Sequence, residues 1–479
     1  MKKTKIICTI GPACSDAETL RSMINSGMNV ARLNFSHGTY PEHQEKIDLI
    51  KAVREEMREP VAILLDTKGP EFRIGTFENK KIELKDGDVF SFTIEDIQGN
   101  NERVSVSYKG LVSELDVDDI ILVNDGLVKF KVREKTNTDL ICDVVVGGVL
   151  SDRKSMSFPN KVLKQTYLSE KDKEDILFGI KNDVDFVACS FVSTAQDVED
   201  VRKFMNENGG RDIQIIAKLE NRSGVDNVKE ILNHCEGIMV ARGDLGVEIP
   251  YVELPAIQKK LITTCRLRGG LAITATEMLE SMISKPRPTR AEISDVANAV
   301  FDGTSGIMLS GETAVGAYPV EAVQAMANIA EEAEKNINYN KRFREFQFQL
   351  RNLNDAISHS TCQLAIDTNS TCIVACTRTG MTGRMICRFR AETPIIGMTT
   401  SEKAYRQLAL SWNVKPVLVD EFTSTDVLFY HAVMVARATQ MAKTGDSIVI
   451  TGGITDGKSG NTNLIKVDTL GPVPRSMHF

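Results

Sequence analysis

Short apolar runs recur along the chain, and each of them ends abruptly in ionisable or small polar residues. The runs are too uniformly apolar for half-exposed strands, so they are typical of buried strands in a parallel sheet. Eight such runs are present, over residues 5–12, 29–38, 61–68, 186–192, 213–221, 237–248, 271–278 and 306–313.

Helical patterns lie between these runs, and several begin with a capping box. In a capping box, a hydroxyl residue and an acidic or amide residue three positions later satisfy each other's backbone N–H groups. The pairs are Ser15 with Glu18, Thr39 with Glu42, Ser193 with Gln196, and Thr289 with Glu292. Eight strand and helix units predict an α/β fold, a (β/α)₈ TIM barrel with its active site at the C-terminal ends of the strands.

The alternation is interrupted twice. From about residue 71 to 166 the pattern changes to short alternating strands and tight turns, which predicts a small β-barrel domain inserted after the third strand. Such an insertion would form a lid over the barrel mouth. We therefore predict a barrel over 1–69 and 167–345, an inserted β lid domain over 70–166, and a C-terminal α/β domain over 346–479.

Composition limits the class of protein, its partners and its cellular location. The 479 residues are 42% hydrophobic and 26% charged, as in a globular protein of two to four domains. A net charge of -7 argues against nucleic acid or an anionic membrane as the main partner. No apolar run is long enough to span a membrane.

The ten cysteines form no Cys-x-x-Cys pair, which is typical of free thiols in a reducing cytosol and predicts a cytoplasmic protein.

Two of the runs deliver ionisable residues to neighbouring strand ends. Lys218 and Glu220 lie two positions apart and so share one face of their strand, and Asp244 lies toward the end of the next run. Carboxylate oxygens are the ligands that Mg²⁺ prefers, and a lysine beside them could neutralise a phosphoryl group. A structural ion pair would explain either motif alone. Both together favour a metal site that binds a phosphorylated substrate.

Residues 452–459 match the P-loop pattern G-x-x-x-x-G-K-[ST]. A true P-loop requires a helix to begin at the lysine, whereas the residues that follow, 460–467, read as a turn and then a strand. The segment is therefore predicted to be a glycine-rich loop beside a strand.

Six further segments, together with the two strand-end motifs, carry a resemblance to the pyruvate kinases that covers essentially the whole chain. They are residues 10–12, 31–38, 65–71, 275–282, 286–292 and 308–314. The resemblance implies transfer of the phosphoryl group of phosphoenolpyruvate to ADP, giving ATP and pyruvate in glycolysis. It also implies a closed homo-oligomer, for which we expect a homotetramer.

The resemblance assigns roles to the residues at the strand ends. Glu220 and Asp244 would hold Mg²⁺ (or Mn²⁺), Lys218 would neutralise the phosphoryl group in flight, and the backbone amide of Gly243 would hold the substrate carboxylate. Thr276 would lie at the face where the enolate is protonated. The immediate proton donor stays open, with a water relay expected. Four further side chains complete this set: Arg32 on the phosphates, Arg242 in a supporting role, and Ser310 and Glu312 near the relay.

The resemblance also implies nucleotide, K⁺ and effector sites. The implied nucleotide contacts are Asn34, Phe35, Ser36, His37, Arg73 and Lys154. The implied K⁺ ligands are Asn34, Ser36, Asp66 and Thr67, and Glu71 is the residue type found in members that require K⁺. The implied loop for a regulatory sugar phosphate or nucleotide is Thr377, Arg378, Thr379, Gly380, Met381 and Thr382. A simple strand-to-helix turn capped by threonines is the alternative for that loop.

Two other classes of protein fit parts of the pattern. A barrel lyase or aldolase could use Mg²⁺ on Glu220 and Asp244 to stabilise an enolate without any nucleotide, but it would not need Lys154 or the inserted domain. A non-catalytic metabolite sensor could dispense with Lys218, yet the catalytic set is intact.

Overall fold

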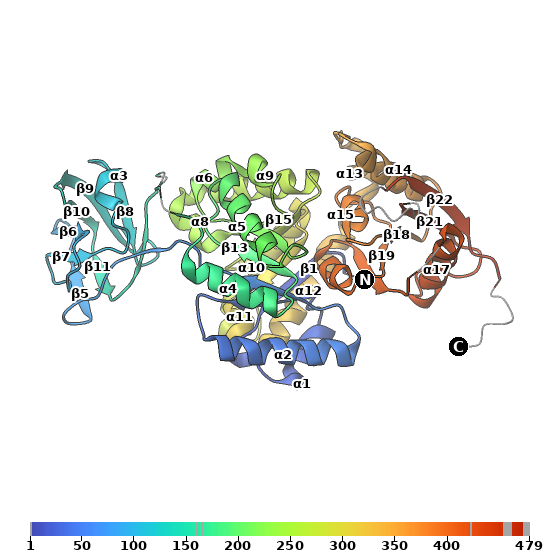
Figure 1. Ribbon diagram of the computed structural model, residues 1–479, viewed down its shortest axis with the longest axis horizontal. Helices are drawn as coiled ribbons and strands as arrows, with labels where there is room; N and C mark the ends of the chain where they lie inside the picture. The colour runs from blue at the N-terminus through green and yellow to red at the C-terminus, as the bar shows by residue number, and fades with distance from the viewer. Residues whose placement is uncertain are drawn as a thin grey trace.

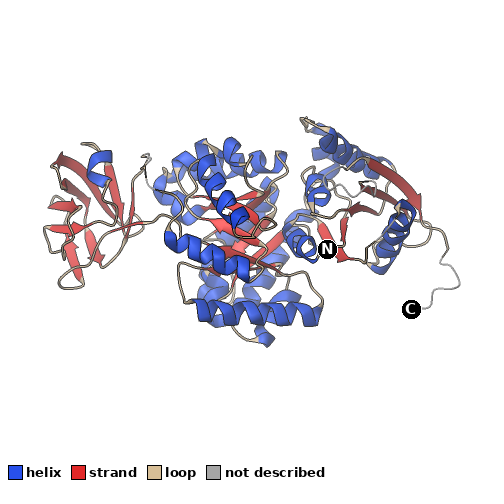
Figure 2. Ribbon diagram, viewed as in Figure 1, coloured by secondary structure: helices blue, strands red, loops and turns tan. Residues whose placement is uncertain are grey.

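The computed structural model describes residues 2–159, 161, 163–164, 166–421, 424–453 and 462–472. Three regions lie in a row, with a helix-wrapped barrel in the middle (Figure 1). A domain made almost entirely of strands lies on one side of the barrel, and a domain of mixed helices and strands lies on the other (Figure 2).

The central region is a closed barrel of eight parallel strands in the order β1-β17-β16-β15-β14-β13-β3-β2. Their bounds are β1 (Lys5–Thr9), β2 (Val30–Asn34), β3 (Ala62–Asp66), β13 (Phe186–Cys189), β14 (Gln214–Leu219), β15 (Gly237–Ala241), β16 (Leu271–Ala275) and β17 (Gly306–Leu309). Each lies within one of the eight predicted runs, so the barrel prediction is confirmed. Alternate side chains such as Ile7, Leu64 and Phe186 fill the barrel interior, while their neighbours pack under the outer helices.

Helices surround the barrel and set the direction in which each strand end points. They are α1 (Ala17–Asn25), α2 (Tyr40–Met57), α4 (Glu170–Lys181), α5 (Ala195–Glu207), α6 (Arg222–Asp226), α7 (Val228–Ile231), α8 (Arg242–Glu248), α9 (Leu254–Leu267), α10 (Arg290–Asp302), α11 (Gly311–Ala314), α12 (Pro319–Lys335) and α13 (Tyr339–Glu345). Short 3₁₀ turns add η1 (Pro12–Cys14), η2 (Tyr251–Glu253) and η3 (Glu280–Ile283).

The predicted capping boxes of α2 and α10 form, with Thr39 bonded to Glu42 and Thr289 to Glu292. The predictions for α1 and α5 are wrong by one residue. Asp16 caps α1 by accepting from the Thr19 N–H, and Thr194 pairs with Asp197 at the start of α5. Each of these residues is itself a good N-cap, so the helix starts one position later than the serine pattern indicates.

The inserted region follows β3 and forms a sheet in the order β4-β12-β8-β9-β10-β6-β7. The bounds are β4 (Phe72–Arg73), β6 (Val89–Thr93), β7 (Arg103–Ser105), β8 (Ile120–Val123), β9 (Val128–Lys135), β10 (Asp139–Val146) and β12 (Ser155–Ser157), with the β5 (Lys81–Leu84) and β11 (Gly148–Ser151) pair and α3 (Leu111–Glu114) beside them. The Gly75 N–H donates to the Ser105 carbonyl at 2.7 Å, and the Ser107 N–H donates to the Arg73 carbonyl at 2.9 Å. These bonds join the two edges of the sheet, so the insertion closes into the small β-barrel predicted from the sequence.

The C-terminal region has a five-stranded sheet in the order β20-β19-β18-β21-β22. Its elements are α14 (Leu353–Asp367), β18 (Cys372–Cys376), α15 (Met381–Cys387), β19 (Ile395–Thr399), α16 (Glu402–Gln407), η4 (Leu408–Leu410), β20 (Val414–Leu418), α17 (Thr425–Ala438), β21 (Ser447–Gly452) and β22 (Leu464–Thr469). Four strands are parallel and β22 is antiparallel to β21. The α/β prediction for this region is confirmed.

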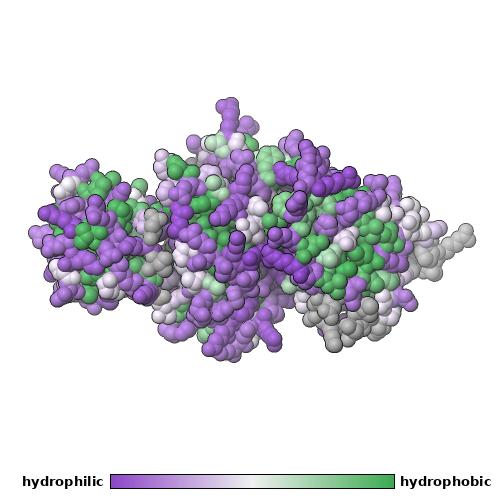
Figure 3. Space-filling model, turned by 90° about the horizontal axis from the view of Figure 1, so that it is seen from above, coloured by the Kyte–Doolittle hydropathy of each residue, from purple (hydrophilic) through white to green (hydrophobic). Residues whose placement is uncertain are grey.

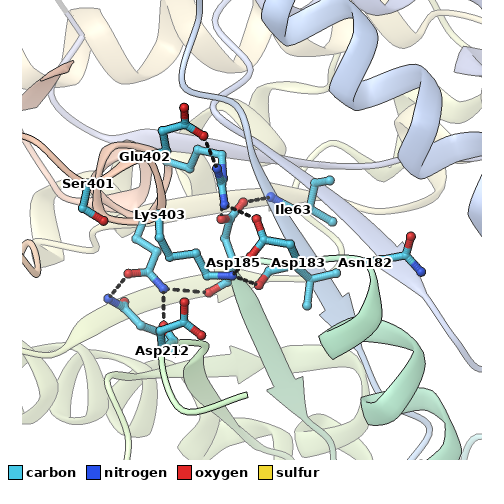
Figure 4. A network of polar contacts seen from close by, with 12 residues as sticks. Ile63, Asn182, Asp183, Asp185, Asp212, Ser401, Glu402 and Lys403 are labelled. Carbon is cyan, nitrogen blue, oxygen red and sulfur yellow. Dashed lines mark hydrogen bonds and ion pairs between the residues drawn. The ribbon is translucent and has the colours of Figure 1, made fainter. Parts of the chain in front are cut away.

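A network of buried charges joins the C-terminal region to the barrel (Figure 4). Arg406 on α16 donates to Asp185 at 2.7 Å and to Asp183 at 2.6 Å, both just before β13. On the other side, Lys5 donates to the carbonyl of Val414 at 2.7 Å. The C-terminal region therefore covers the N-terminal ends of the strands and leaves the opposite mouth for chemistry. In the described part of the chain, no helix is long and apolar enough to cross a membrane.

Candidate active site

Lys218 lies at the C-terminal end of β14, where it meets Glu220 from the same strand end and residues from the ends of two other strands, β3 and β13. Its Nζ is 3.0 Å from Asp66 Oδ1 and 3.1 Å from Glu220 Oε1, and it donates to Ser190 Oγ at 2.6 Å. Burial alone would lower the pKa of Lys218. The negative charges of Asp66 and Glu220 have the larger effect and raise that pKa above its usual value. The lysine is therefore a permanent ammonium in a site that is almost closed to solvent.

Glu220 shares this site, and its ion pair with Lys218 only partly offsets the cost of burying its charge. One carboxylate oxygen accepts from the Phe191 N–H at 2.6 Å, and the other, Oε1, has no hydrogen-bond partner in the described structure. Burial raises the pKa of Glu220 to about 7; Lys218 opposes the shift and Asp244 adds to it. A buried carboxylate oxygen with a free lone pair, facing a second carboxylate, fits a divalent cation.

Asp244 is the second carboxylate, and it lies in the first turn of α8 with its side chain exposed to the mouth. Three or more His, Cys, Asp or Glu side chains do not converge anywhere in the described residues. Two carboxylates with open positions suit Mg²⁺, which keeps substrate oxygens and waters in its coordination shell.

Arg32 reaches into the same mouth from β2. It donates to Asp66 Oδ2 at 2.6 Å and to Thr9 Oγ1 at 2.8 Å, and it is 9% exposed. Burial would raise the pKa of Asp66, but Lys218 and Arg32 together hold that pKa below its usual range. Asp66 thus fixes the direction of two cations.

The residues implied as K⁺ ligands lie side by side on β2 and β3. Asn34 is the register partner of Asp66, and its side-chain oxygen accepts from the Ser36 N–H at 3.1 Å. Thr67 directly follows Asp66 in the chain, and its hydroxyl accepts a hydrogen bond from the Ser190 N–H at 3.3 Å. The structure therefore brings these four oxygen-bearing residues together.

Thr276 follows β16 in a conformation that is rare for a β-branched residue, with φ of 67°, and the next residue, Glu277, has φ of 53°. Arg242 holds this segment in place. Its guanidinium donates to the Thr276 carbonyl at 2.6 Å and the Glu277 carbonyl at 3.0 Å, and Asp295 on α10 binds it at 2.6 and 2.8 Å. Backbone strain of this kind is typical of functional sites. Arg242 therefore positions the threonine.

The Gly243 amide donates to Thr276 Oγ1 at 2.7 Å in this structure. A methyl group placed on Gly243 would make ordinary van der Waals contact with the Thr276 side chain, whose Oγ1 would lie 3.5 Å away. The amide and the threonine hydroxyl therefore lie directly against each other.

Ser310 and Glu312 lie at the end of β17. Both oxygens of Glu312 accept from backbone N–H groups, one from Ser310 at 2.7 Å and the other from Leu279 at 3.0 Å. The Ser310 hydroxyl is buried and has no partner in the described structure. Neither residue bonds directly to Thr276, so a relay through them would need an intervening water.

A cavity of about 340 Å³ lies between the β lid domain and the barrel mouth. Glu71, Arg73, Lys154 and Asp244 all contribute to its lining. Arg73 is held by Glu71 Oε2, at 2.7 and 2.9 Å, and donates to the Arg153 carbonyl at 2.7 Å. The structure therefore brings the two predicted lid-domain cations to the mouth.

Residues 34–37 follow β2 and do not line that cavity. Ser36 and His37 are exposed, whereas Phe35 is 4% exposed and stacks on His43 with ring centroids 4.0 Å apart. The Phe35 ring anchors this turn from below, so only its backbone is available to a nucleotide.

The loop implied to hold an effector connects β18 to α15. Arg378 and Thr379 are exposed, and Gly380 has φ of 78°. Thr382 is buried, and its hydroxyl bonds to that of Thr462 at 2.9 Å. Most of the P-loop-like segment, from residue 454 onward, lies outside the described residues. The strand predicted after it is β22.

Three residues of the site were missed by sequence reasoning. Ser190 contacts Lys218, Asp295 holds Arg242, and Glu248 lies between Asp244 and the lid domain. Ser190 lies near the end of the predicted run 186–192 and directly follows β13, so the strand-end argument could have found it. Asp295 lies on α10, 53 positions along the chain from Arg242, and no strand-end position marks it in the sequence.

Glu248 makes the site sensitive to pH. Burial raises its pKa to about 7, although Ser157 and the Phe158 backbone favour the ionised form. The folded state therefore retains a proton between pH 4.5 and 7 that the unfolded state has lost. We expect the free energy of unfolding to decrease as pH rises through this window, and Glu248→Gln to remove about 1 to 2 kcal/mol of that decrease.

Urea unfolding of both proteins at pH 5 and pH 8 measures this difference. Glu253→Gln is the matched control, because Glu253 pairs with Arg222 at 2.6 Å at the surface nearby. Equal pH dependence in the wild type and Glu248→Gln would contradict the expectation.

Comparison with known proteins identifies the family. Residues 1–323 match the family model "Pyruvate kinase, barrel domain", and residues 355–468 match "Pyruvate kinase, alpha/beta domain". Curated pyruvate kinases from Clostridium perfringens and Clostridium acetobutylicum are each 46% identical, with 98% of this chain and 100% of theirs covered. The crystal structure of a pyruvate kinase from Cryptosporidium parvum has a TM-score of 0.93 and 37% identity, covering 98% of this chain and 96% of that one. The chain belongs to the pyruvate kinase family.

Proposed function

We propose that Lys218, Glu220 and Asp244 form the phosphoryl-transfer centre of this enzyme. As a pyruvate kinase, it transfers the phosphoryl group of phosphoenolpyruvate to ADP, giving ATP and pyruvate. The observation that carries the residue assignment is the buried Lys218 ammonium, 3.1 Å from a Glu220 carboxylate whose nearest oxygen has no hydrogen bond.

Glu220 and Asp244 are proposed to hold Mg²⁺ or Mn²⁺, which when bound polarises phosphoryl and carboxylate oxygens as a Lewis acid. Lys218 supplies a fixed positive charge beside those oxygens. Because Asp66 and Ser190 already orient the ammonium, little reorganisation is needed when negative charge shifts during transfer. Arg32 supplies a second fixed charge at the same edge.

The Gly243 amide is proposed to release Thr276 and bind the substrate carboxylate when substrate enters. Thr276 then lies next to the enolate, and a water beside the unpartnered Ser310 hydroxyl completes the path for the proton. Arg242 fixes the segment that carries the threonine. A threonine hydroxyl is a weak acid, so the proton reaches the enolate through this relay.

Nucleotide binding is proposed for the lid side of the mouth. Arg73 and Lys154 line the cavity beside Asp244, and residues 34–37 approach from β2. Closure of the lid domain onto ADP would exclude water from the phosphoryl group.

A K⁺ ion is proposed to bind at Asn34, Ser36, Asp66 and Thr67. We expect removal of monovalent cations to lower the turnover rate by about tenfold or more, because one fixed positive charge at the phosphates is lost. In Glu71→Lys the ammonium of the introduced lysine replaces the charge of the K⁺ ion, so we expect activity to become independent of K⁺.

Steady-state rates in K⁺ and in tetramethylammonium salts at equal ionic strength measure this dependence. Glu78→Lys, an exposed change in the same lid domain, is the control and retains the K⁺ requirement. Equal wild-type activity in both salts would contradict a K⁺ site.

The remaining proposals concern regulation, assembly and location. Thr377–Thr382 is proposed to bind the phosphate of a regulatory sugar phosphate or nucleotide, because the exposed side chains of Arg378 and Thr379 lie next to each other at one strand end. A homotetramer is supported by exposed apolar side chains such as Leu353 and Tyr430 in the C-terminal region, where Figure 3 shows a broad hydrophobic face. All ten cysteines are free, which supports a cytoplasmic location.

A coupled assay for pyruvate tests the function. We expect pyruvate release from phosphoenolpyruvate only when both ADP and Mg²⁺ are present, and a loss of activity in Asp244→Asn that added Mg²⁺ partly restores. Pyruvate release without ADP would point instead to a lyase or phosphatase.

A further inference from the structure

A second cavity, of about 350 Å³, lies between the barrel and the C-terminal region. Its walls come from the C-terminal ends of α9 and α10, from α13, and from residues 389, 390 and 412 of the C-terminal region. Helices in this fold run back toward the strand N-termini, so the cavity lies at the opposite end of the barrel from Lys218. It is also separated from the Thr377–Thr382 loop by the length of α15.

Three arginines line this cavity, and none has a carboxylate within 4.0 Å in the described part of the chain: Arg266, Arg342 and Arg390. Arg266 has one long bond, 3.5 Å to the Arg388 carbonyl, and its buried Nε has no partner. Arg390 is 6% exposed, and its two terminal nitrogens donate only to uncharged oxygens, at 2.6 to 3.1 Å. Its buried Nε has no partner among the described residues. Buried guanidinium groups without counter-charges are costly unless a ligand supplies the charge.

The carboxylates in the lining do not neutralise these arginines. Asp302 pairs with Lys259 at 2.9 Å, and Glu345 lies 3.8 Å from Lys341. Burial, together with repulsion from Arg390 and Arg342, lowers the pKa of Arg266 to about 9. The cavity therefore carries unmatched positive charge.

Aromatic rings form the rest of the wall. The Arg266 guanidinium lies 5.4 Å from the Phe346 ring, and that of Arg390 lies 4.7 Å from the Trp412 ring. Phe348 and Phe389 pack edge to face beside them with centroids 4.8 Å apart. Cations next to flat apolar surfaces suit a ligand that is partly anionic and partly apolar.

We propose that this cavity binds a small organic anion whose phosphate or carboxylate group faces Arg266 and whose apolar portion lies against Phe346 and Phe348. Guanidinium groups bind both kinds of anion through paired hydrogen bonds. The volume is within the range of small-molecule sites. A ligand here would contact both the barrel and the C-terminal region and so stabilise their docking.

Isothermal titration with phenyl phosphate tests this proposal. We expect the wild type to bind with a Kd of about 1 mM or tighter, and Arg266→Met to weaken that binding by about tenfold. Arg268→Met is the matched control, because Arg268 is two residues away on the same helix end and bonds only to Lys229 and Asn233 outside the cavity. It is expected to change the Kd by less than about twofold. Arg342→Met, at an exposed position on α13, provides a second variant whose folding is not at risk and is also expected to weaken binding.

Thermal melting without ligand gives an independent readout. Arg266→Met removes a partly buried guanidinium that has no carboxylate partner among the residues that the structure describes, so its melting temperature should equal or exceed that of the wild type, whereas loss of a merely structural arginine would lower it. Binding of phenyl phosphate that is equal in the wild type and both variants, or absent up to about 10 mM, would overturn the proposal. Inorganic phosphate that binds as tightly as phenyl phosphate would overturn the apolar half of it.

Discussion

Lys218→Met is expected to lower the rate of phosphoryl transfer on the order of 10³-fold or more. The methionine keeps most of the volume of the side chain but removes the ammonium that lies between Asp66, Glu220 and Ser190. That ammonium is already oriented beside Glu220, one of the two proposed Mg²⁺ ligands. We therefore expect kcat to decrease, while the KM for phosphoenolpyruvate changes far less.

Lys171→Met is the matched control for this change. Lys171 also neutralises a buried aspartate, Asp175, at 2.6 Å, but it lies on α4 outside the mouth. Both variants lose a lysine paired with a buried carboxylate, so a general loss of stability would affect them alike. Turnover within a few-fold of the wild type in Lys218→Met, with the fold intact by circular dichroism, would contradict the role assigned to Lys218.

Arg406→Met is expected to lower the free energy of unfolding by about 3 kcal/mol. Asp185 is fully buried, and Arg406 donates to it at 2.7 Å and to Asp183 at 2.6 Å (Figure 4). Removing the arginine leaves Asp185 with the Ile63 N–H at 2.8 Å and the more distant Arg54 at 3.7 Å. An uncompensated buried carboxylate is costly, and the contact between the C-terminal region and the barrel depends on this pair.

Urea unfolding measures this effect, with Arg21→Met as the control. Arg21 pairs with Glu56 at 2.8 Å at the surface, where such pairs contribute about 0 to 1 kcal/mol. Adding Asp185→Asn to Arg406→Met removes the unpaired Asp185 charge and should restore part of the lost free energy of unfolding. A cost for Arg406→Met no larger than that of Arg21→Met would show that the buried network does not hold the two regions together.

The barrel could be predicted from the sequence because its strands are buried on both faces. Residues 215–217 are apolar, and the ionisable residues that follow them, Lys218 and Glu220, mark the end of the strand. The inserted domain was predicted because its strands alternate, as the pattern of buried and part-exposed residues along β9 and β10 shows. In each case the local pattern reflects burial directly.

The parts that sequence reasoning missed depend on contacts between distant residues. The left-handed backbone at Thr276 and Glu277 opposes their own preferences and is held by Arg242 and Asp295 from two other elements. Phe35 is among the predicted nucleotide contacts, and the packing of its ring on His43 beneath the turn could not be read from the sequence. No local pattern encodes either arrangement.

A crystal structure with phosphoenolpyruvate and Mn²⁺, with the metal located by its anomalous scattering, tests the central claim most directly. The proposal predicts one Mn²⁺ within about 2.2 Å of an oxygen from Glu220 and one from Asp244, and Lys218 Nζ within about 3 Å of a phosphate oxygen. A metal bound away from these two carboxylates, or a phosphate held without contact to Lys218, would contradict it.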